Sequence, residues 1–141
     1  MRLMGLDVGE KRVGIALSDP LGWTAQSYAV MPRASHPKEV EYLQKICTEF
    51  TVEKLIFGLP INMNGTKGDK AREIEFYAER MVESLKLPYE WVDERLTTKS
   101  AQDLLISADV SRGKRKQVVD KMAAAYILQI YLDKITHTNK N

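Results

Sequence analysis

Hydrophobic residues in the first third of the chain fall in short runs separated by turn residues, a pattern typical of β-strands. Residues 2–8 and 12–18 are both apolar and are joined by the short turn 9–11, which predicts an antiparallel hairpin. Turn-forming residues at 19–22 end the second run, and a third, more exposed strand is predicted over 25–31. The chain is therefore expected to begin with three antiparallel strands.

The spacing of apolar residues changes after residue 35. Val40, Leu43, Cys47 and Phe50 recur at helical intervals, and Pro37 suits the first turn of that helix. The same reasoning predicts strands over 54–57 and 89–93, and helices over 70–86, from Thr97 or Thr98 to Ala108, and over 118–135. This order predicts an α/β fold with a mixed five-stranded sheet, three antiparallel strands then two parallel ones, and helices on both faces.

Composition sets the broad class. The 141 residues, 44% hydrophobic, are expected to form a single domain spanning 1–141, with a polar tail over 136–141 that frays. The apolar start is too short for a signal segment, no apolar run is long enough to span a membrane, and Cys47 has no partner for an internal disulfide. We therefore expect a cytoplasmic protein without membrane contact. The net charge of +2 is only mildly basic, so any nucleic-acid binding has to be indicated by local clusters.

Asp7 stands out because aspartate is rare within strands and costly to bury unless it is paired or bound to a metal. It lies in the first apolar run between Gly5 and Gly9, whose missing side chains would let a ligand or a phosphodiester backbone come close. The same residue could instead cap the turn at 9–11. Asp7 by itself leaves both interpretations open.

Two further acids are predicted at the ends of separate elements. Glu94 follows the strand 89–93, and ligands gather beyond the carboxyl ends of parallel strands; an exposed glutamate paired with Arg95 is the alternative. Asp120 is expected in the first turn of the last helix, where it could point at the same site or only stabilise the helix terminus. Together, three carboxylates from three elements suit two-metal phosphodiester hydrolysis, which needs hard oxygen ligands around two divalent ions.

Four segments of the chain resemble motifs of the YqgF family. They are GLDVGEKRVGIALSD (5–19), GLP (58–60) with Gly65 and Gly68, DERLTT (93–98) and KQVVDKMAA (116–124), in this order along nearly the whole chain. The resemblance implies a ribonuclease H-like fold related to RuvC-type resolvases. It also implies that Asp7, Glu94 and Asp120 form a catalytic, metal-binding triad of a hydrolase, a two-metal nuclease that uses Mg²⁺ or Mn²⁺.

The resemblance implies a nucleic-acid substrate of one of two kinds. The first role is maturation of the 5′ end of the 16S ribosomal RNA precursor, a structured RNA that could be met within a pre-ribosomal particle. The second is resolution of four-way DNA junctions (Holliday junctions) in recombination and repair. We expect the first, although residue spacing does not decide between them. A resolvase usually acts as a dimer, so whether the chain is a monomer or a homodimer stays open.

Basic residues accompany each acid, as a phosphate backbone would require. The run before Asp120 is expected to form a loop ahead of the last helix, and a merely solvated loop is the alternative. The loop 61–67 could shape the substrate channel or be an ordinary crossover. The predicted nucleic-acid contacts are Lys11 and Arg12 after Asp7, Arg95 after Glu94, and Arg112, Lys114, Arg115 and Lys116 before Asp120.

Two other classes of function fit parts of the pattern. Asp7 and Gly9, followed by Gly14, also resemble the first phosphate loop of the actin, sugar-kinase and Hsp70 superfamily. Those ATP-binding proteins need two such lobes, and 141 residues provide room for one. A nucleic-acid- or ribosome-binding module that keeps the fold without the chemistry is the other class, and the presence of all three acids argues against it.

Overall fold

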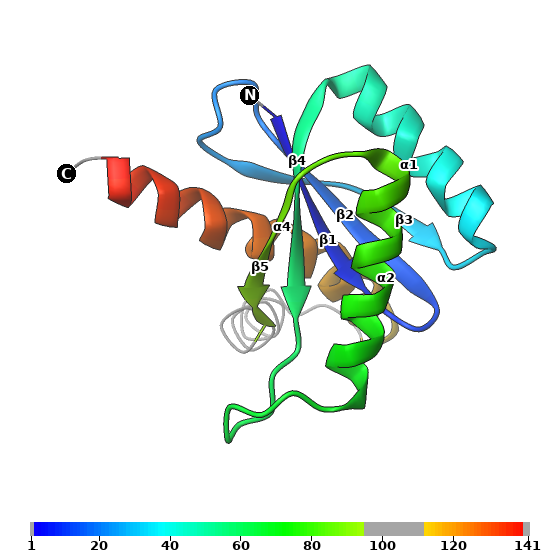
Figure 1. Ribbon diagram of the computed structural model, residues 1–141. Coiled ribbons are helices and arrows are strands. Elements are labelled where there is room, and N and C mark those ends of the chain that lie inside the picture. Colours follow the sequence, from blue (N-terminus) through cyan, green and yellow to red (C-terminus); the bar gives the residue numbers. More distant parts are fainter. Residues whose placement is uncertain (1, 95–111, 140–141) are drawn as a thin grey trace.

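The computed structural model describes residues 2–94 and 112–139, with side chains described for 2–94 and 122–136. The hairpin strands and β5 coincide with their predicted ranges, and α1 and α2 begin and end within about one turn of theirs. The elements, labelled in Figure 1, are β1 (Arg2–Val8), β2 (Arg12–Ser18), β3 (Ala25–Pro32), α1 (His36–Phe50), β4 (Val52–Leu59), α2 (Asp69–Leu85), β5 (Tyr89–Asp93) and α4 (Arg112–Asn139).

The five strands form one mixed sheet in the order β3-β2-β1-β4-β5. β2 pairs antiparallel with both β1 and β3, whereas β4 pairs parallel with both β1 and β5. The predicted mixed sheet is therefore confirmed. Because β1, β4 and β5 run in the same direction, their carboxyl ends lie at one edge of the sheet, where Figure 1 shows the arrowheads of β4 and β5 side by side.

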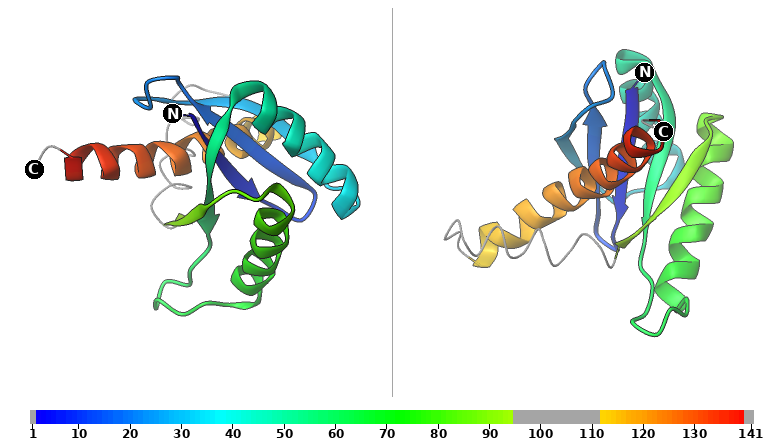
Figure 2. Two further views of the ribbon diagram at one scale, coloured as in Figure 1. Left: turned by 45° about the horizontal axis from the view of Figure 1, so that its top comes forward. Right: turned by 90° about the vertical axis from the view of Figure 1, so that its left-hand side faces the viewer.

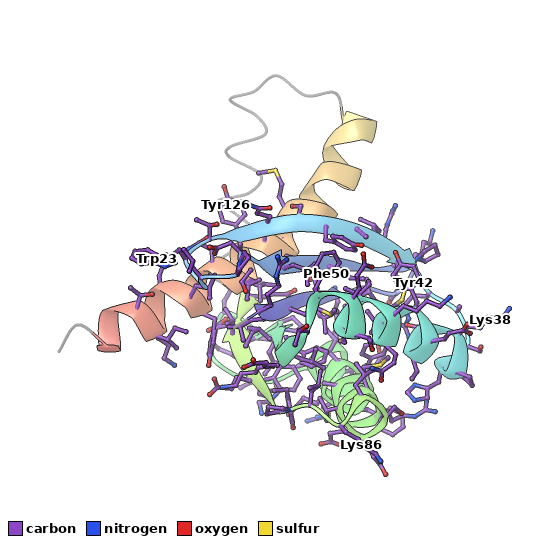
Figure 3. The ribbon with its side chains drawn as sticks, turned by 90° about the horizontal axis from the view of Figure 1, so that it is seen from above. Trp23, Lys38, Tyr42, Phe50, Lys86 and Tyr126 are labelled. Carbon is purple, nitrogen blue, oxygen red and sulfur yellow. The ribbon has the colours of Figure 1, made fainter. Side chains whose placement is uncertain are left out.

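Helices cover both faces of the sheet, as predicted. Alternate residues of β1 point to opposite faces. Met4 and Leu6 pack in the core beneath α1 and α2, whereas Leu3 packs in a second core with α4. Figure 3 shows the sheet between α4 on one side and α1 and α2 on the other, and the right-hand view of Figure 2 shows α4 crossing the strands. By this alternation Gly5 and Asp7 lie on the α4 face.

Helices α1 and α2 both end in a left-handed residue that is not glycine. Thr51 has φ 53° and its N–H donates to the carbonyl of Cys47; Lys86 has φ 57° and its N–H donates to that of Val82. The left-handed conformation brings the Cβ atom close to the following carbonyl, and the cost is greatest for a β-branched side chain such as Thr51. These two turns return the chain to β4 and β5 at the cost of local backbone strain.

The last helix differs from its prediction at both ends. α4 begins at Arg112 and ends at Asn139, so it includes the basic run that was expected to be a loop and part of the polar tail. Arginine, lysine and glutamine are good helix formers, and the run contains only one glycine, so its charge did not prevent helix formation. The helix predicted from residue 97 or 98 to 108 lies outside the described residues. No helix of the described part of the chain is long and apolar enough to cross a membrane.

Candidate active site

Two of the three predicted acids meet at the carboxyl edge of the parallel strands. Asp7 is the last but one residue of β1, and Glu94 directly follows β5. β4 lies between these two strands, yet the side chains of Asp7 and Glu94 share a hydrogen bond. We call these two residues the acidic pair. The turn-capping alternative for Asp7 does not account for a partner on the far side of a neighbouring strand.

Gly58 of β4 provides the space across which the acidic pair makes contact. A Cβ atom built at Gly58 would lie 3.0 Å from Cγ of Glu94 and 2.4 Å from Cδ1 of Ile127 in α4. The 2.4 Å contact is too short for a real Cβ atom, so a side chain here would force the end of the Ile127 side chain to move and would crowd the Glu94 side chain. Gly58 was predicted only as the end of a strand, and its position between the two acids follows from the strand order.

Burial and mutual repulsion make Asp7 hard to ionise in the metal-free protein. The pKa of Asp7 is raised from 3.8 to about 8, most strongly by removal of the carboxyl from water and further by the hydrogen bond and negative charge of Glu94. The positive charge of Lys70 opposes them. A cation bound beside the two carboxyl groups would favour the ionised form of Asp7.

Asp7 of the acidic pair lines a cavity of about 360 Å³, which we call the acidic pocket. Lys11, Arg12 and Lys70 line it together with Asp7. Two of these cations were predicted, whereas Lys70, in the first turn of α2, was missed because an exposed lysine at a helix start has no distinguishing sequence pattern. Gly14 lies directly opposite Asp7 in the hairpin and also lines this pocket, so the space beside the carboxylate comes from a glycine on the neighbouring strand.

The two glycines that flank Asp7 in sequence have other roles. A Cβ at Gly5 would lie 2.8 Å from the Ala124 carbonyl oxygen and 2.8 Å from Cβ of Leu128, so Gly5 lets α4 pack against the sheet. A Cβ at Gly9 would lie 2.9 Å from the Arg12 carbonyl oxygen, so Gly9 permits the tight hairpin turn. The expectation that they clear space for a ligand is therefore corrected for Gly5, whose space is filled by the helix.

A buried carboxylate holds the turn that follows Asp7. Arg33 donates from Nη1 to the Gly9 carbonyl at 2.9 Å and from its backbone N–H to the Lys11 carbonyl at 2.9 Å. Glu39, only 3% exposed, pairs with Nε of Arg33 at 3.3 Å and accepts a hydrogen bond from the Tyr77 hydroxyl at 2.8 Å. Burial and Glu39 raise the pKa of Tyr77, which stays protonated. This network fixes the backbone next to the acidic pair.

The remaining predicted residues lie where the structure describes no side chains. Asp120 falls within α4, well beyond the first turn in which it was expected, because the helix begins earlier. Arg112, Lys114, Arg115 and Lys116 also belong to α4. Arg95 lies outside the described residues. Asp120 precedes Ala124, which contacts Gly5 on the Asp7 face of the sheet, by about one helical turn.

The acidic pair has the donor chemistry of a site for a hard divalent cation. Two carboxyl groups in contact, one of them with a strongly raised pKa, supply oxygen ligands and a negative charge that a cation would neutralise. No third histidine, cysteine, aspartate or glutamate joins them among the residues that the structure describes. Mg²⁺ commonly binds through one or two carboxylates plus waters and substrate phosphates. The acidic pair could therefore supply the protein ligands of one such ion.

Comparison with known proteins gives a consistent result. The model of the RuvX family, described as Holliday junction resolvase, matches residues 1–134. A Syntrophomonas wolfei protein named "Putative pre-16S rRNA nuclease" is 55% identical over 133 residues, which are 94% of this chain and 94% of that protein. A Desulforamulus reducens protein of the same name is 53% identical, over 94% of this chain and 97% of its own.

Solved structures show the same fold in more distant proteins. Thermus thermophilus RuvC in complex with a Holliday junction substrate superposes with a TM-score of 0.58 at 12% identity, covering 98% of this chain and 97% of its own. The fowlpox virus resolvase bound to Holliday junction DNA gives a TM-score of 0.54 at 14% identity, over 96% and 99% of the two chains. At these identities the likeness concerns the fold, which is the RuvC-like form of the ribonuclease H fold.

Proposed function

This chain belongs to the RuvX/YqgF family, and on that premise we propose that it is a metal-dependent endonuclease that processes the 5′ end of the 16S ribosomal RNA precursor. The observation that carries the proposal is the contact between Asp7 and Glu94, with Asp7 lining an open pocket together with Lys11, Arg12 and Lys70. Relatives of about 50% identity that carry the name of a pre-16S rRNA nuclease support the choice of substrate.

The acidic pair would hold the metal, and Asp120 is proposed as the third acid. Asp7, in the hairpin strand β1 beside β4, would hold divalent ions together with Glu94 and Asp120. Bound Mg²⁺ or Mn²⁺ would lower the pKa of a water so that it can attack phosphorus and would neutralise charge on the leaving oxygen. Asp120 is included because α4 packs on the same face of the sheet as Asp7, about one helical turn further along.

The chain's own residues would bind and orient the substrate strand. Lys11, Arg12 and Lys70 line the acidic pocket, so their ammonium and guanidinium groups can neutralise phosphates on either side of the scissile bond. Arg33 holds the turn that carries Lys11, which limits how far that cation can move. Arg95 and the basic residues of the first turns of α4 are proposed to extend this contact along the strand.

The test is a cleavage assay on RNA that contains the 5′ leader of the 16S precursor, with Mg²⁺ or Mn²⁺ and with EDTA as the metal-free arm. We expect cleavage by the wild-type protein and none by Asp7→Asn or Glu94→Gln, while both variants still bind the RNA. Asp133→Asn is the matched control, because Asp133 is exposed near the far end of α4. Normal cleavage by Asp7→Asn would contradict the proposal.

Resolution of four-way DNA junctions is the second candidate, favoured by the description of the family model. The same assay on a synthetic four-way junction separates the two. Paired, symmetric cuts by a dimer with no cleavage of the RNA leader would replace the first proposal with the second. Binding of RNA with cleavage of neither substrate would leave a binding module.

A further inference from the structure

A second cavity adjoins the acidic pocket. Its volume is about 300 Å³, and it shares Gly9, Glu10 and Lys70 with the acidic pocket, so the two are continuous around the hairpin turn. The stripe of α2 that begins at Lys70 and ends at Arg80 forms its other wall. We call it the Phe76 cavity after the aromatic residue at its rim.

The walls of the Phe76 cavity offer an apolar and aromatic surface. Val8 and Ile74 lie at its base, and Phe76 is 62% exposed, which is unusual for a large apolar side chain. The guanidinium of Arg80 lies 5.7 Å from the centre of the Phe76 ring, so a cation accompanies the exposed aromatic surface. Tyr77 is half-buried and has Arg33 4.8 Å from its ring centre, so the more exposed ring of Phe76 offers the larger stacking surface of the two.

Two carboxylates add hydrogen-bond acceptors to the cavity, beside the basic side chains of Arg33, Lys70 and Arg80 that also line it. Glu10 and Glu73 both line it, and both are exposed. Carboxylates only accept hydrogen bonds, and the usual donor in nucleic-acid recognition is an exocyclic amino group of a base. The cavity therefore combines a stacking surface with hydrogen-bond acceptors and with cations, and Lys70 is the cation that it shares with the acidic pocket.

Resting on the proposed nuclease function, we propose that the Phe76 cavity receives one unpaired nucleobase next to the scissile phosphate. Phe76 stacks on the base, and Glu73 and Glu10 favour bases with an exocyclic amino group over uracil. Lys70, which lines both cavities, binds the phosphate between that base and the cut. An aromatic surface with adjacent cations is the common platform for bases of a single strand.

The experiment varies one base at a time in the RNA substrate. Each unpaired nucleotide flanking the cut is replaced in turn by an abasic nucleotide, and kcat/KM is measured for the wild-type protein, Phe76→Ala and Tyr42→Ala. Tyr42 is the matched control because it is an exposed aromatic residue of α1 that lines neither cavity (Figure 3). At one position we expect a loss of about tenfold in the wild type and in Tyr42→Ala. Phe76→Ala should show a similar loss with the intact RNA and no further loss with the abasic one.

A second series tests the base preference. At the sensitive position, uridine in place of cytidine or adenosine is expected to lower kcat/KM several-fold in the wild type and in Glu79→Ala. The effect should shrink in Glu73→Ala. Glu79 is an exposed glutamate on the same helix outside the cavity. Equal rates for all four bases in the wild type would refute the role of the carboxylates.

The failure of this inference can be distinguished from the failure of the nuclease proposal. Cleavage that is insensitive to every abasic replacement, or unchanged in Phe76→Ala, overturns the base-binding role and leaves the nuclease intact. If the wild type does not cleave, binding of short single-stranded RNA is measured by fluorescence anisotropy with Ca²⁺. Binding weakened by Phe76→Ala and by an abasic nucleotide then supports the cavity without the nuclease, and equal binding overturns the inference.

Discussion

Replacement of Asp7 by asparagine is expected to stabilise the metal-free protein, because the wild-type carboxyl is held in an unfavourable place. The variant keeps a polar side chain of the same shape that can still donate a hydrogen bond to Glu94. It removes the negative charge whose burial and repulsion raise the pKa of Asp7. An acid that is costly in the free protein and useful with a bound cation is typical of functional sites.

The expected magnitude follows from the pKa in the two states. The folded protein holds the Asp7 proton up to about pH 8, whereas the unfolded chain releases it near pH 3.8. Between these values the unfolded state binds fewer protons, so the free energy of unfolding falls as the pH rises, by at most about 1.4 kcal/mol per pH unit. From pH 5 to pH 8 the wild type should lose about 2 to 4 kcal/mol relative to Asp7→Asn.

The assay is urea denaturation in EDTA at pH 5 and pH 8, with Asp133→Asn as the control for loss of an exposed aspartate. We expect the free energy of unfolding of Asp7→Asn, relative to the wild type, to increase from pH 5 to pH 8. The difference between Asp133→Asn and the wild type should be the same at both pH values. Addition of Mg²⁺ at pH 8 should then stabilise the wild type and not Asp7→Asn, by about 2.7 kcal/mol at a concentration one hundred times Kd. An advantage of Asp7→Asn that is equal at both pH values would refute the electrostatic reasoning.

Three further outcomes can be checked by urea denaturation. Gly58→Ala should lower the free energy of unfolding by about 1 to 3 kcal/mol and reduce cleavage, because its Cβ would lie 2.4 Å from Cδ1 of Ile127. Wild-type stability and cleavage in this variant would show that position 58 has room for a side chain. Thr51→Gly should raise the free energy of unfolding by about 1 kcal/mol by relieving a φ of 53°, and a loss of stability would show that the strain is absent. Glu39→Gln should cost about 2 kcal/mol or more, because it leaves the Arg33 charge without its buried partner, and a neutral effect would argue against this pair.

Much of the fold could be predicted because the local signals agree with the tertiary structure. The hairpin strands β1 and β2 have apolar runs of strand length with a short turn between them, so the first and last residues of both strands were predicted correctly. The contact of Asp7 with Glu94 follows from one topological rule, that carboxyl ends of parallel strands share an edge. The start of α4 was missed because a run of charge was interpreted as a loop, although its residues are good helix formers.

The parts that could not be predicted depend on neighbours that are distant in sequence. In the sequence Glu39 is an ordinary acid of a helix's first turn, and only the folded chain brings Arg33 and Tyr77 against it. Lys70 acquires its role only because α2 begins beside the hairpin turn. Gly5 and Gly9 were noticed, but whether their space is taken by a ligand or by the protein itself depends on where α4 packs.

The order of the strands has a consequence for the folding of the chain. Asp7 belongs to the first strand and Glu94 follows the fifth, which is short and lies at the edge of the sheet. Pairing of β5 brings together residues far apart in sequence, and such contacts are slow to form. A chain on which β5 has not yet joined the sheet holds Asp7 without its partner. If the acidic pair holds the metal as proposed, a nascent or partly unfolded molecule would be unable to cut nucleic acid, and cleavage would begin only when the sheet is complete.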